Sequence, residues 1–412
     1  MKRDKMIDIM SKGIPKDWQI VKLVDIATYI NGYPFSPKDW KEKGLPIIRI
    51  QNLNDPEAEF NYFDGEIDKK YFVENGDLLF SWSASIGVYI WNRGKAVLNQ
   101  HIFKVVPKEN VNKLYLYYAL YLAIEQLKNR VHGSTMKHFK RSELKTTLIP
   151  LPPLPEQKKI AEILSTVDKA IEKVDEAIAK TERLKKGLMQ ELLTKGIGHK
   201  EFKYSKELGC EIPKEWKVVK LSDVAKKFIS GGTPSTKQPK YWNGDIPWIR
   251  SVHITKYYLD ESMIEQYITK EGLENSASNI VPKDSLIVAT RVGIGKSTVN
   301  LIDVAINQDL TGIVLNESKV DPFYLVLYFH FPKIINLLEA VARGTTIKGI
   351  SQDYIKNMLI PLPPIEEQRK IAEILSTVDK KLELERKRKE KLERIKKGLM
   401  NDLLTGRKRV KV

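Results

Sequence analysis

Short runs of apolar residues broken by Gly, Pro, Asn and Asp fill two long stretches of the chain, residues 1–153 and 199–364. Such runs, bounded by turn-forming residues, predict β-strands. Three of them are Leu45–Ile50, Asp77–Phe80 and Ser285–Ala289. The segments Tyr115–Lys128 and Phe323–Ala342 predict helices, and Pro332 should kink or end the second one. Both stretches are therefore expected to be mixed α+β.

A different periodicity follows each stretch. From Glu156 to Thr194, apolar residues alternate at spacings of four and three over more than four heptads, which predicts a long helix with an a/d seam. The second seam has the same spacing but carries two charged residues in its middle. Its positions are Ile371, Leu375, Val378, Leu382, Glu385, Lys389, Leu392, Lys396, Leu399 and Leu403, and those of the first are Ile160, Leu164, Val167, Ile171, Val174, Ile178, Thr181, Lys185, Leu188 and Leu192. We expect the two helices to pack antiparallel on each other; packing of each helix on its own globular segment is the alternative.

The chain is an internal duplication. Leu148–Pro153 returns unchanged as Leu359–Pro364, and Ala161–Lys169 as Ala372–Lys380, both at an offset of 211 residues. Ile14–Ala27 matches Ile212–Ala225 at an offset of only 198, so the middle of the second copy has gained 13 residues, where loops are expected. The copies are faithful at their ends and divergent in their middles, which suggests two surfaces for two related targets.

Two local features concern how the helices join their surroundings. The Pro-rich segments Pro150–Pro155 and Pro361–Pro364 should end each globular domain and form a stiff, extended joint. Gly187 and Gly398 lie inside the predicted helices, where glycine costs about 1 kcal/mol relative to alanine. Close approach of two helices is a plausible reason for them.

Composition narrows the class of protein only a little. A chain of 412 residues with 42% hydrophobic and 29% charged residues can hold two or more ordinary globular domains. We find no membrane-length apolar run and no secretory signal, and the single Cys210 cannot form an internal disulfide, so a cytoplasmic location is expected. The net charge of +17 invites a nucleic-acid partner, but Lys380–Val412 alone holds 14 basic against 5 acidic residues. Global charge is therefore weak support.

Motifs for catalysis are nearly absent. Gly293–Thr298 resembles the end of a phosphate-binding loop, but Thr290 stands where that loop needs its first glycine. The six histidines show no metal-ligand spacing. We therefore expect that the chain is not an enzyme on its own and holds no metal or cofactor.

Matched polar residues in the two copies are candidates for DNA contact. Gly133–Lys137 and Gly344–Lys348 share the order Gly, two hydroxyl residues, an apolar residue and Lys, which suits phosphate oxygens; a turn with a helix cap is the alternative. Arg49 and Arg250 each follow a predicted strand and could read a guanine edge, or could pair with a carboxylate of their own domain. The full candidate set is Arg49, Ser134, Thr135, Lys137, Lys140, Arg141, Arg250, Arg291, Lys296, Arg343, Thr345, Thr346 and Lys348.

With these elements in place, the chain resembles the specificity subunits of type I restriction-modification systems. The resemblance rests on Ile-Pro-Lys-x-Trp at Ile14 and Ile212, on Ile246–Ile249, on the Gly-Ser/Thr-Thr elements, and on the Leu-Pro-Pro-x-x-Glu-Gln motif before each long helix. It implies two target recognition domains, residues 1–153 and 199–364, with spacer helices at 154–198 and 365–412, the second including the basic tail.

The resemblance also implies partners and a task. These are double-stranded DNA, two methyltransferase subunits that bind S-adenosylmethionine for adenine methylation, and an endonuclease-translocase subunit that uses ATP and Mg. The chain itself would read a bipartite, asymmetric DNA site, one half-site per domain. A free-standing DNA-binding protein and a coiled-coil scaffold without a DNA role remain the alternatives.

Overall fold

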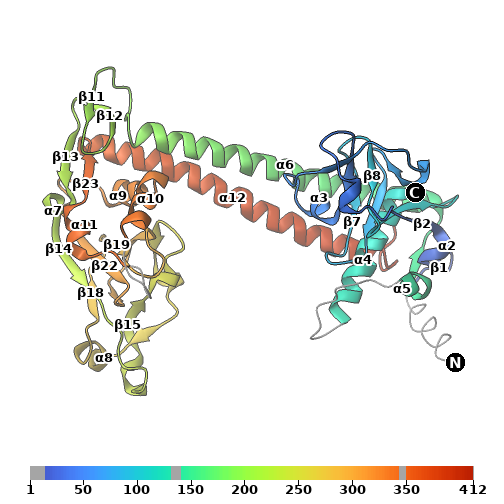
Figure 1. Cartoon of the computed structure of the whole chain (residues 1–412). Coiled ribbons are helices and arrows are strands. Elements are labelled where there is room, and N and C mark those ends of the chain that lie inside the picture. The colour runs from blue at the N-terminus through green and yellow to red at the C-terminus, as the bar shows by residue number, and fades with distance from the viewer. Residues whose placement is uncertain (1–13, 131–140, 343–348, 412) are drawn as a thin grey trace. The chain divides into compact units, whose positions relative to one another are not determined.

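The computed structural model of the chain describes residues 14–130, 141–342 and 349–411 (Figure 1). By its internal contacts the chain divides into two compact units, residues 1–176 with 387–412 (unit 1) and residues 177–386 (unit 2). Each unit therefore contains one part of each long helix, α6 (Leu154–Leu192) and α12 (Ile365–Leu403).

Unit 1 is an α+β assembly of two four-stranded sheets and a short ladder. The sheets have the orders β2-β9-β6-β7 and β4-β3-β8-β5, and the ladder pairs β1 with β10. The strands are β1 (Gln19–Lys22), β2 (Ala27–Asn31), β3 (Leu45–Ile48), β4 (Asn61–Phe63), β5 (Phe72–Val73), β6 (Leu78–Ser81), β7 (Gly87–Ile90), β8 (Ala96–Leu98), β9 (Ile102–Pro107) and β10 (Leu148–Leu151). The helices are α2 (Leu23–Ile26), α3 (Ile50–Asn54), α4 (Lys113–Arg130) and α5 (Arg141–Thr146).

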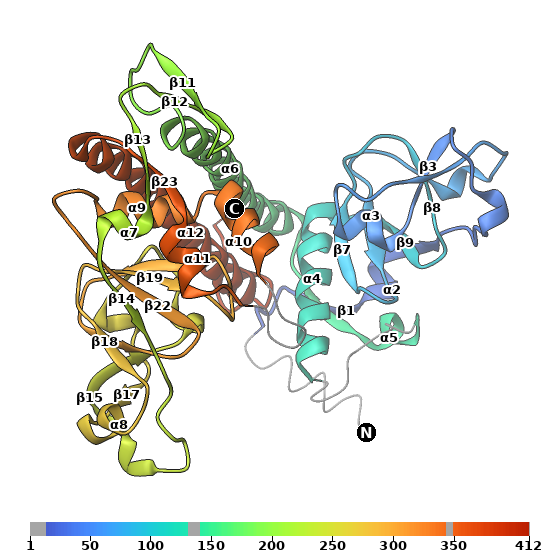
Figure 2. The same ribbon diagram turned by 60° about the vertical axis from the view of Figure 1, so that its left-hand side comes forward.

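Unit 2 repeats this plan with additions. Its sheets have the orders β14-β22-β19-β20-β16 and β17-β15-β21-β18, and its ladders pair β13 with β23 and β11 with β12 (Figure 2). The strands are β11 (Phe202–Ser205), β12 (Cys210–Pro213), β13 (Lys217–Lys220), β14 (Ala225–Ser230), β15 (Trp242–Ile249), β16 (Tyr258–Leu259), β17 (Tyr267–Ile268), β18 (Asn279–Val281), β19 (Leu286–Ala289), β20 (Ser297–Asn300), β21 (Val304–Ile306), β22 (Leu310–Leu315) and β23 (Leu359–Leu362). The helices are α7 (Leu221–Val224), α8 (Lys270–Glu274), α9 (Pro322–Phe329), α10 (Pro332–Val341) and α11 (Gln352–Asn357).

The predicted break at Pro332 is confirmed, because α9 ends before Pro332 and α10 begins at it. The two helices are bent by 65°, and together they are the one stretch with the length and composition of a broken membrane span; among the described residues no single helix is long and apolar enough to cross a membrane. All but the first two residues of α9 are buried in the core of unit 2. There they contact the long helices, as α4 does in unit 1.

The long helices pack antiparallel in each unit, as the heptad pattern predicts. In unit 1, Lys396 pairs with Asp168 at 2.6 Å and Lys389 with Asp175 at 2.7 Å, so seven residues forward along α6 match seven residues back along α12. In unit 2, Lys185 of α6 pairs with Asp379 of α12. Every seam position of both helices is buried or half-buried. The lysines that interrupt the apolar seams are therefore accommodated by aspartates of the facing helix.

The Pro-rich joints are extended, but each one is also a paired strand. β10 pairs antiparallel with β1, with Pro150 opposite Ile20, and β23 pairs with β13 in the same way. Each joint therefore connects the start of a unit to the start of a long helix. A two-stranded ladder tolerates proline because the missing N–H can face away from the partner strand.

A buried glutamine fixes each joint from the helix side. Gln157, 1% exposed, donates to the carbonyls of Pro152 (2.8 Å) and Asn110 (3.1 Å) and accepts from the Asn112 N–H (2.8 Å). Gln368, fully buried, makes the equivalent three bonds in unit 2, to Pro363 (2.8 Å), Lys319 (3.1 Å) and Asp321 (2.9 Å). The same side chain therefore holds the proline turn and the loop before the core helix in both units.

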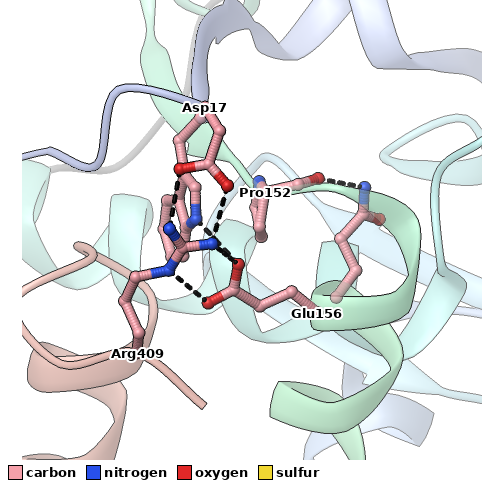
Figure 3. Close-up of polar contacts among 6 residues, drawn as sticks. Asp17, Pro152, Glu156 and Arg409 are labelled. Atoms are coloured by element: carbon pink, nitrogen blue, oxygen red, sulfur yellow. Dashed lines mark hydrogen bonds and ion pairs between the residues drawn. The ribbon is translucent and has the colours of Figure 1, made fainter. Parts of the chain in front are cut away.

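A glutamate before each of these glutamines, buried in unit 1 and partly buried in unit 2, joins three segments of its unit. Glu156, 2% exposed, accepts from the Trp18 indole at 3.0 Å and from Arg409 at 2.6 and 3.1 Å, while Arg409 also holds Asp17 through two bonds of 2.7 Å (Figure 3). The basic C-terminal tail is thus engaged within unit 1 at Arg409. Burial of a carboxylate is costly without such partners.

In unit 2 the equivalent carboxylate has different partners at the same place. Glu367 accepts from the Trp216 indole at 3.0 Å and from the Ile197 N–H at 2.9 Å, and His199 Nε2 lies 2.8 Å from it. Ile197 and His199 lie in the segment that follows α6, as Arg409 lies in the segment that follows α12. In each unit, the segment after the end of one long helix therefore returns to the start of the other.

The expectation that Gly187 and Gly398 permit close helix approach is wrong. A Cβ atom at either position would meet no atom within 4 Å, and both residues are exposed. These glycines therefore only weaken their helices.

Replacing either Gly187 or Gly398 by Ala should stabilise the chain by about 1 kcal/mol, measured as a rise in the urea midpoint. No gain in either variant would contradict this account.

Replacing Gln157 by Leu should destabilise unit 1, and Gln368→Leu should destabilise unit 2, each by about 3 kcal/mol. Each change removes the partner of three backbone groups, one buried and two partly buried, and each buried group left unsatisfied costs about 1–3 kcal/mol. Chemical denaturation followed by tryptophan fluorescence measures the loss. Gln190→Leu, at an exposed position of α6, is the matched control and should change stability little. Equal effects of control and test variants would contradict the assignment.

Candidate nucleic-acid interface

Four loops of unit 1 meet where its strands end. β3 runs parallel to β8, and the N–H of Asn99 donates to the Ile48 carbonyl at 3.2 Å, which joins the ends of these strands. Gly32 lies against the same place, since a Cβ there would be 2.1 Å from the Asn99 carbonyl oxygen. The hairpin tip after β6 joins through the Trp82 N–H, which donates to His101 at 3.2 Å. We call these residues, Asn31–Tyr33, Arg49, Trp82–Ile86 and Asn99–His101, the loop edge of unit 1.

The same convergence occurs in unit 2. The Asn307 N–H donates to Ile249 at 3.0 Å, and the Thr290 N–H donates to Asp309 at 2.8 Å. Gly231 repeats the close approach, since its Cβ would lie 2.2 Å from the Ile306 carbonyl oxygen. The loop edge of unit 2 comprises Gly231–Thr233, Arg250, Thr290–Lys296 and Asn307–Asp309. Matched backbone contacts therefore present matched loops in both units.

Arg49 and Arg250 occupy equivalent positions on these edges. The Arg49 N–H donates to the Asn52 side chain at 3.0 Å, and the Arg250 N–H donates to His253 Nδ1 at 3.1 Å. The Arg49 guanidinium donates to Asn61 at 2.8 Å and lies 5.0 Å from the Trp40 ring centre, so it is held in place. The Arg250 side chain is exposed, and its guanidinium has no hydrogen-bond or ion-pair partner among the described residues.

Arg291 and Lys296 lie in the hairpin between β19 and β20, and both side chains are exposed. The hairpin contacts the residues that follow the second Gly-Thr-Thr element, because the Ile350 N–H donates to Thr290 at 2.7 Å. Gly293–Thr298 leads from a turn into strand β20 and not into a helix, so it lacks the helix N-terminus of a phosphate loop.

Most of the other sequence-predicted candidates cannot be placed. Ser134, Thr135, Lys137 and Lys140, and in the second copy Arg343, Thr345, Thr346 and Lys348, lie outside the described residues. Arg141 begins α5, and its side chain is not described. The loop edges thus bring together four of the thirteen candidates, Arg49 in unit 1 and Arg250, Arg291 and Lys296 in unit 2.

Sequence reasoning missed several residues of the loop edges. Trp82 and His101 pack together in unit 1, with ring centres 5.3 Å apart, and Trp82 donates to Asn31 at 3.2 Å. In unit 2, Thr233 donates to Gln308 at 2.6 Å. The Asn-Gln pair that is repeated in the two copies could have marked this part of the loop edges in the sequence. It does not show which other side chains lie beside it in the fold.

The loop edges carry no sign of catalytic or metal chemistry. In the part of the chain that the structure describes, no group of three His, Cys, Asp or Glu side chains could hold a metal ion. His253 lies under Arg250 at 6% exposure, and burial lowers its pKa, with the Arg250 charge acting in the same direction and Glu265 opposing both. A neutral His253 accepts the Arg250 N–H through Nδ1. Exposed cationic and amide side chains at these loop ends can donate hydrogen bonds to a nucleic acid.

The class of protein follows from this geometry together with comparisons with known proteins. A family model described as the type I restriction modification DNA specificity domain matches residues 15–181 and 213–394, one match in each copy of the repeat. The chain therefore belongs to the family of type I restriction-modification specificity subunits, which are non-catalytic DNA-recognition subunits.

Individual relatives agree over nearly the full length. The chain is 33% identical to a putative type I restriction enzyme MjaX specificity subunit of Methanocaldococcus jannaschii, covering 97% of this chain and 95% of that one. It is 32% identical to the MjaVIII specificity subunit of the same organism, covering 100% and 97%. A solved specificity subunit from M. genitalium shares the fold with a TM-score of 0.58 at 15% identity, covering 94% of this chain and 96% of that one. The predicted family and fold class are confirmed.

Unit 2 should lose stability on mild acidification. Burial lowers the pKa of His330 and His253 below the usual 6.5. Below about pH 6.5 these histidines therefore bind protons more readily in the unfolded chain than in the folded unit, which favours unfolding. The contribution of the two neutral histidines to the free energy of unfolding is fully present above this pH and is lost as the pH falls. Urea denaturation at about pH 7.5 and 5.5 measures the difference. The double variant His330→Gln and His253→Asn should reduce it, while the exposed control His101→Asn should not; an unchanged pH dependence in the double variant would contradict the prediction.

Proposed function

We propose that this chain reads a bipartite, asymmetric DNA site, one half-site with the loop edge of each unit. Two matched loop edges on one duplicated frame, with different side chains, are the observation that supports this proposal. The frame gives both edges matched backbone contacts, whereas Ser83 and His101 of unit 1 stand where unit 2 has Arg291 and Asp309. Different side chains at matched positions select different bases.

The proposal assigns the four segments different tasks. Residues 1–153 and 199–364 are the target recognition domains, and residues 154–198 and 365–412 are the spacer helices, including the tail. We assign DNA contact to the predicted set of thirteen residues, with Arg49, Arg250, Arg291 and Lys296 nearest to base edges. Such contacts combine phosphate positioning with base readout.

The partners follow from family membership. Two methyltransferase subunits would bind the repeated parts of the frame and use S-adenosylmethionine for adenine methylation. An endonuclease-translocase subunit with ATP and Mg would join for cleavage. The duplicated frame supports two copies of the same partner, because the parts shared by the two halves offer each copy the same contacts.

The arrangement of the DNA site follows from the helices. Since α6 and α12 run antiparallel in each unit and the chain is an internal duplication, we expect the two half-sites to be inverted relative to each other. Domains that reach the same side of the duplex favour centres about one helical turn, about 10 base pairs, apart. Half-sites of about three to five pairs then leave an unread spacer of about five to eight.

Inserting one helical turn, four residues, into both α6 and α12 should lengthen the spacer and leave the half-sites unchanged. Four residues add about 6 Å of helix, equivalent to about one to two base pairs of duplex. The methylated motif of the assembled methyltransferase, read by modification-sensitive sequencing, gives the result. Replacing the exposed residues Glu172 and Lys173 of α6 by Ala, without a change in length, is the control. Half-site sequences that change with helix length would contradict the proposal.

A further inference from the structure

One position of the loop edge is built by the same backbone contact in both units. In unit 1 the residue after β6, Trp82, donates its N–H to His101, and in unit 2 the residue after β19, Thr290, donates its N–H to Asp309. His101 and Asp309 each stand two residues after the asparagine of the repeated Asn-Gln pair. We call this position the corner. Since the backbone contact is the same, equivalent side chains should meet equivalent steps of the two half-sites.

The corner of unit 1 is aromatic. Trp82 is half-buried against Phe103 at 6.0 Å between ring centres, and His101 beside it is exposed. The Trp82 indole donates to the exposed Asn31 at 3.2 Å, which orients the ring. Gln100, the neighbour of His101, has the same identity as Gln308 in unit 2 and therefore does not distinguish the two units.

The corner of unit 2 carries an exposed cation and an ordered carboxylate. Arg291 follows Thr290, and its side chain has no hydrogen-bond or ion-pair partner among the described residues. Asp309 is fixed by Asn307, which donates to its carboxylate at 2.8 Å and accepts its N–H at 3.1 Å. Neither an arginine nor a carboxylate stands at the matched positions of unit 1, where Ser83 and His101 are found.

These side chains complement different base pairs. Arginine reads the O6 and N7 atoms of guanine with two bonds, and a carboxylate accepts a bond from the cytosine amino group, so Arg291 and Asp309 together match one G·C pair. An aromatic surface without a carboxylate or guanidinium favours contact with the methyl group of thymine. We propose that the corner is a specificity determinant, selecting an A·T pair in the half-site of unit 1 and a G·C pair at the equivalent step in the half-site of unit 2. This assignment rests on the proposed function.

The test is the methylated motif of the whole complex with variants of either corner. Arg291→Ala should relax one G·C position of one half-site by about 5- to 150-fold, since a bidentate contact contributes about 1–3 kcal/mol of discrimination. Trp82→Ala should relax one A·T position of the other half-site. His101→Ala, at an exposed position, provides a second variant of the same corner should Trp82→Ala fail to fold. Lys217→Ala, an exposed position on β13, removes one positive charge outside the loop edge and should leave the motif unchanged.

The outcomes separate this assignment from the proposed function. Changes confined to one position, in different half-sites for the two corners, support it. An active complex whose motif is unchanged by Arg291→Ala, or whose two corner variants alter the same half-site, overturns the corner assignment and leaves the bipartite reading intact. A wild-type complex that methylates a single uninterrupted site overturns both.

Discussion

The carboxylate at the start of each long helix, buried in unit 1 and 12% exposed in unit 2, is the constraint on which each unit depends. An ionised group out of water costs several kcal/mol unless its oxygens are satisfied, so Glu156 and Glu367 need fixed donors. A tryptophan indole supplies one donor in both units, and the segment after the other long helix supplies the rest. One buried charge therefore ties the start of the unit, the start of one helix and the end of the other into a single arrangement.

The frame was largely predictable because its signals are periodic or repeated. The heptads predicted both long helices and their antiparallel pairing, and the duplication predicted that each feature occurs twice. The strand pairing of β1 with β10 was not predictable, because it joins segments more than a hundred residues apart and proline argues against a ladder. The role of Gly187 was not predictable, because a glycine inside a helix has more than one explanation; the open space around it excludes close packing.

The loop edges were less predictable, for a physical reason. Arg49 and Arg250 could be found because each follows a repeated strand motif, so their positions are fixed by the part of the sequence that the copies share. Trp82 and His101 lie in the diverged middle, where the repeated Asn-Gln pair stands beside His101 but no repeat marks Trp82, and the backbone bond that brings the two residues together is long-range. Side chains that differ between copies leave no internal pattern, although they are the ones that can distinguish two targets.

The ion pairs of the C-terminal segment show how part of its positive charge is used. Lys389 and Lys396 of α12 and Arg386 beside them pair with Asp175, Asp168 and Glu182 of α6, and Arg409 of the tail pairs with Asp17 and Glu156. Part of the basic excess of the C-terminal segment is thus used to hold the helices and to join the tail to unit 1. The cations left without partners among the described residues of the loop edge of unit 2, Arg250, Arg291 and Lys296, are few. In the proposed reading of DNA, recognition depends on where a few unpaired groups stand on a loop edge, and backbone hydrogen bonds within the unit fix that position.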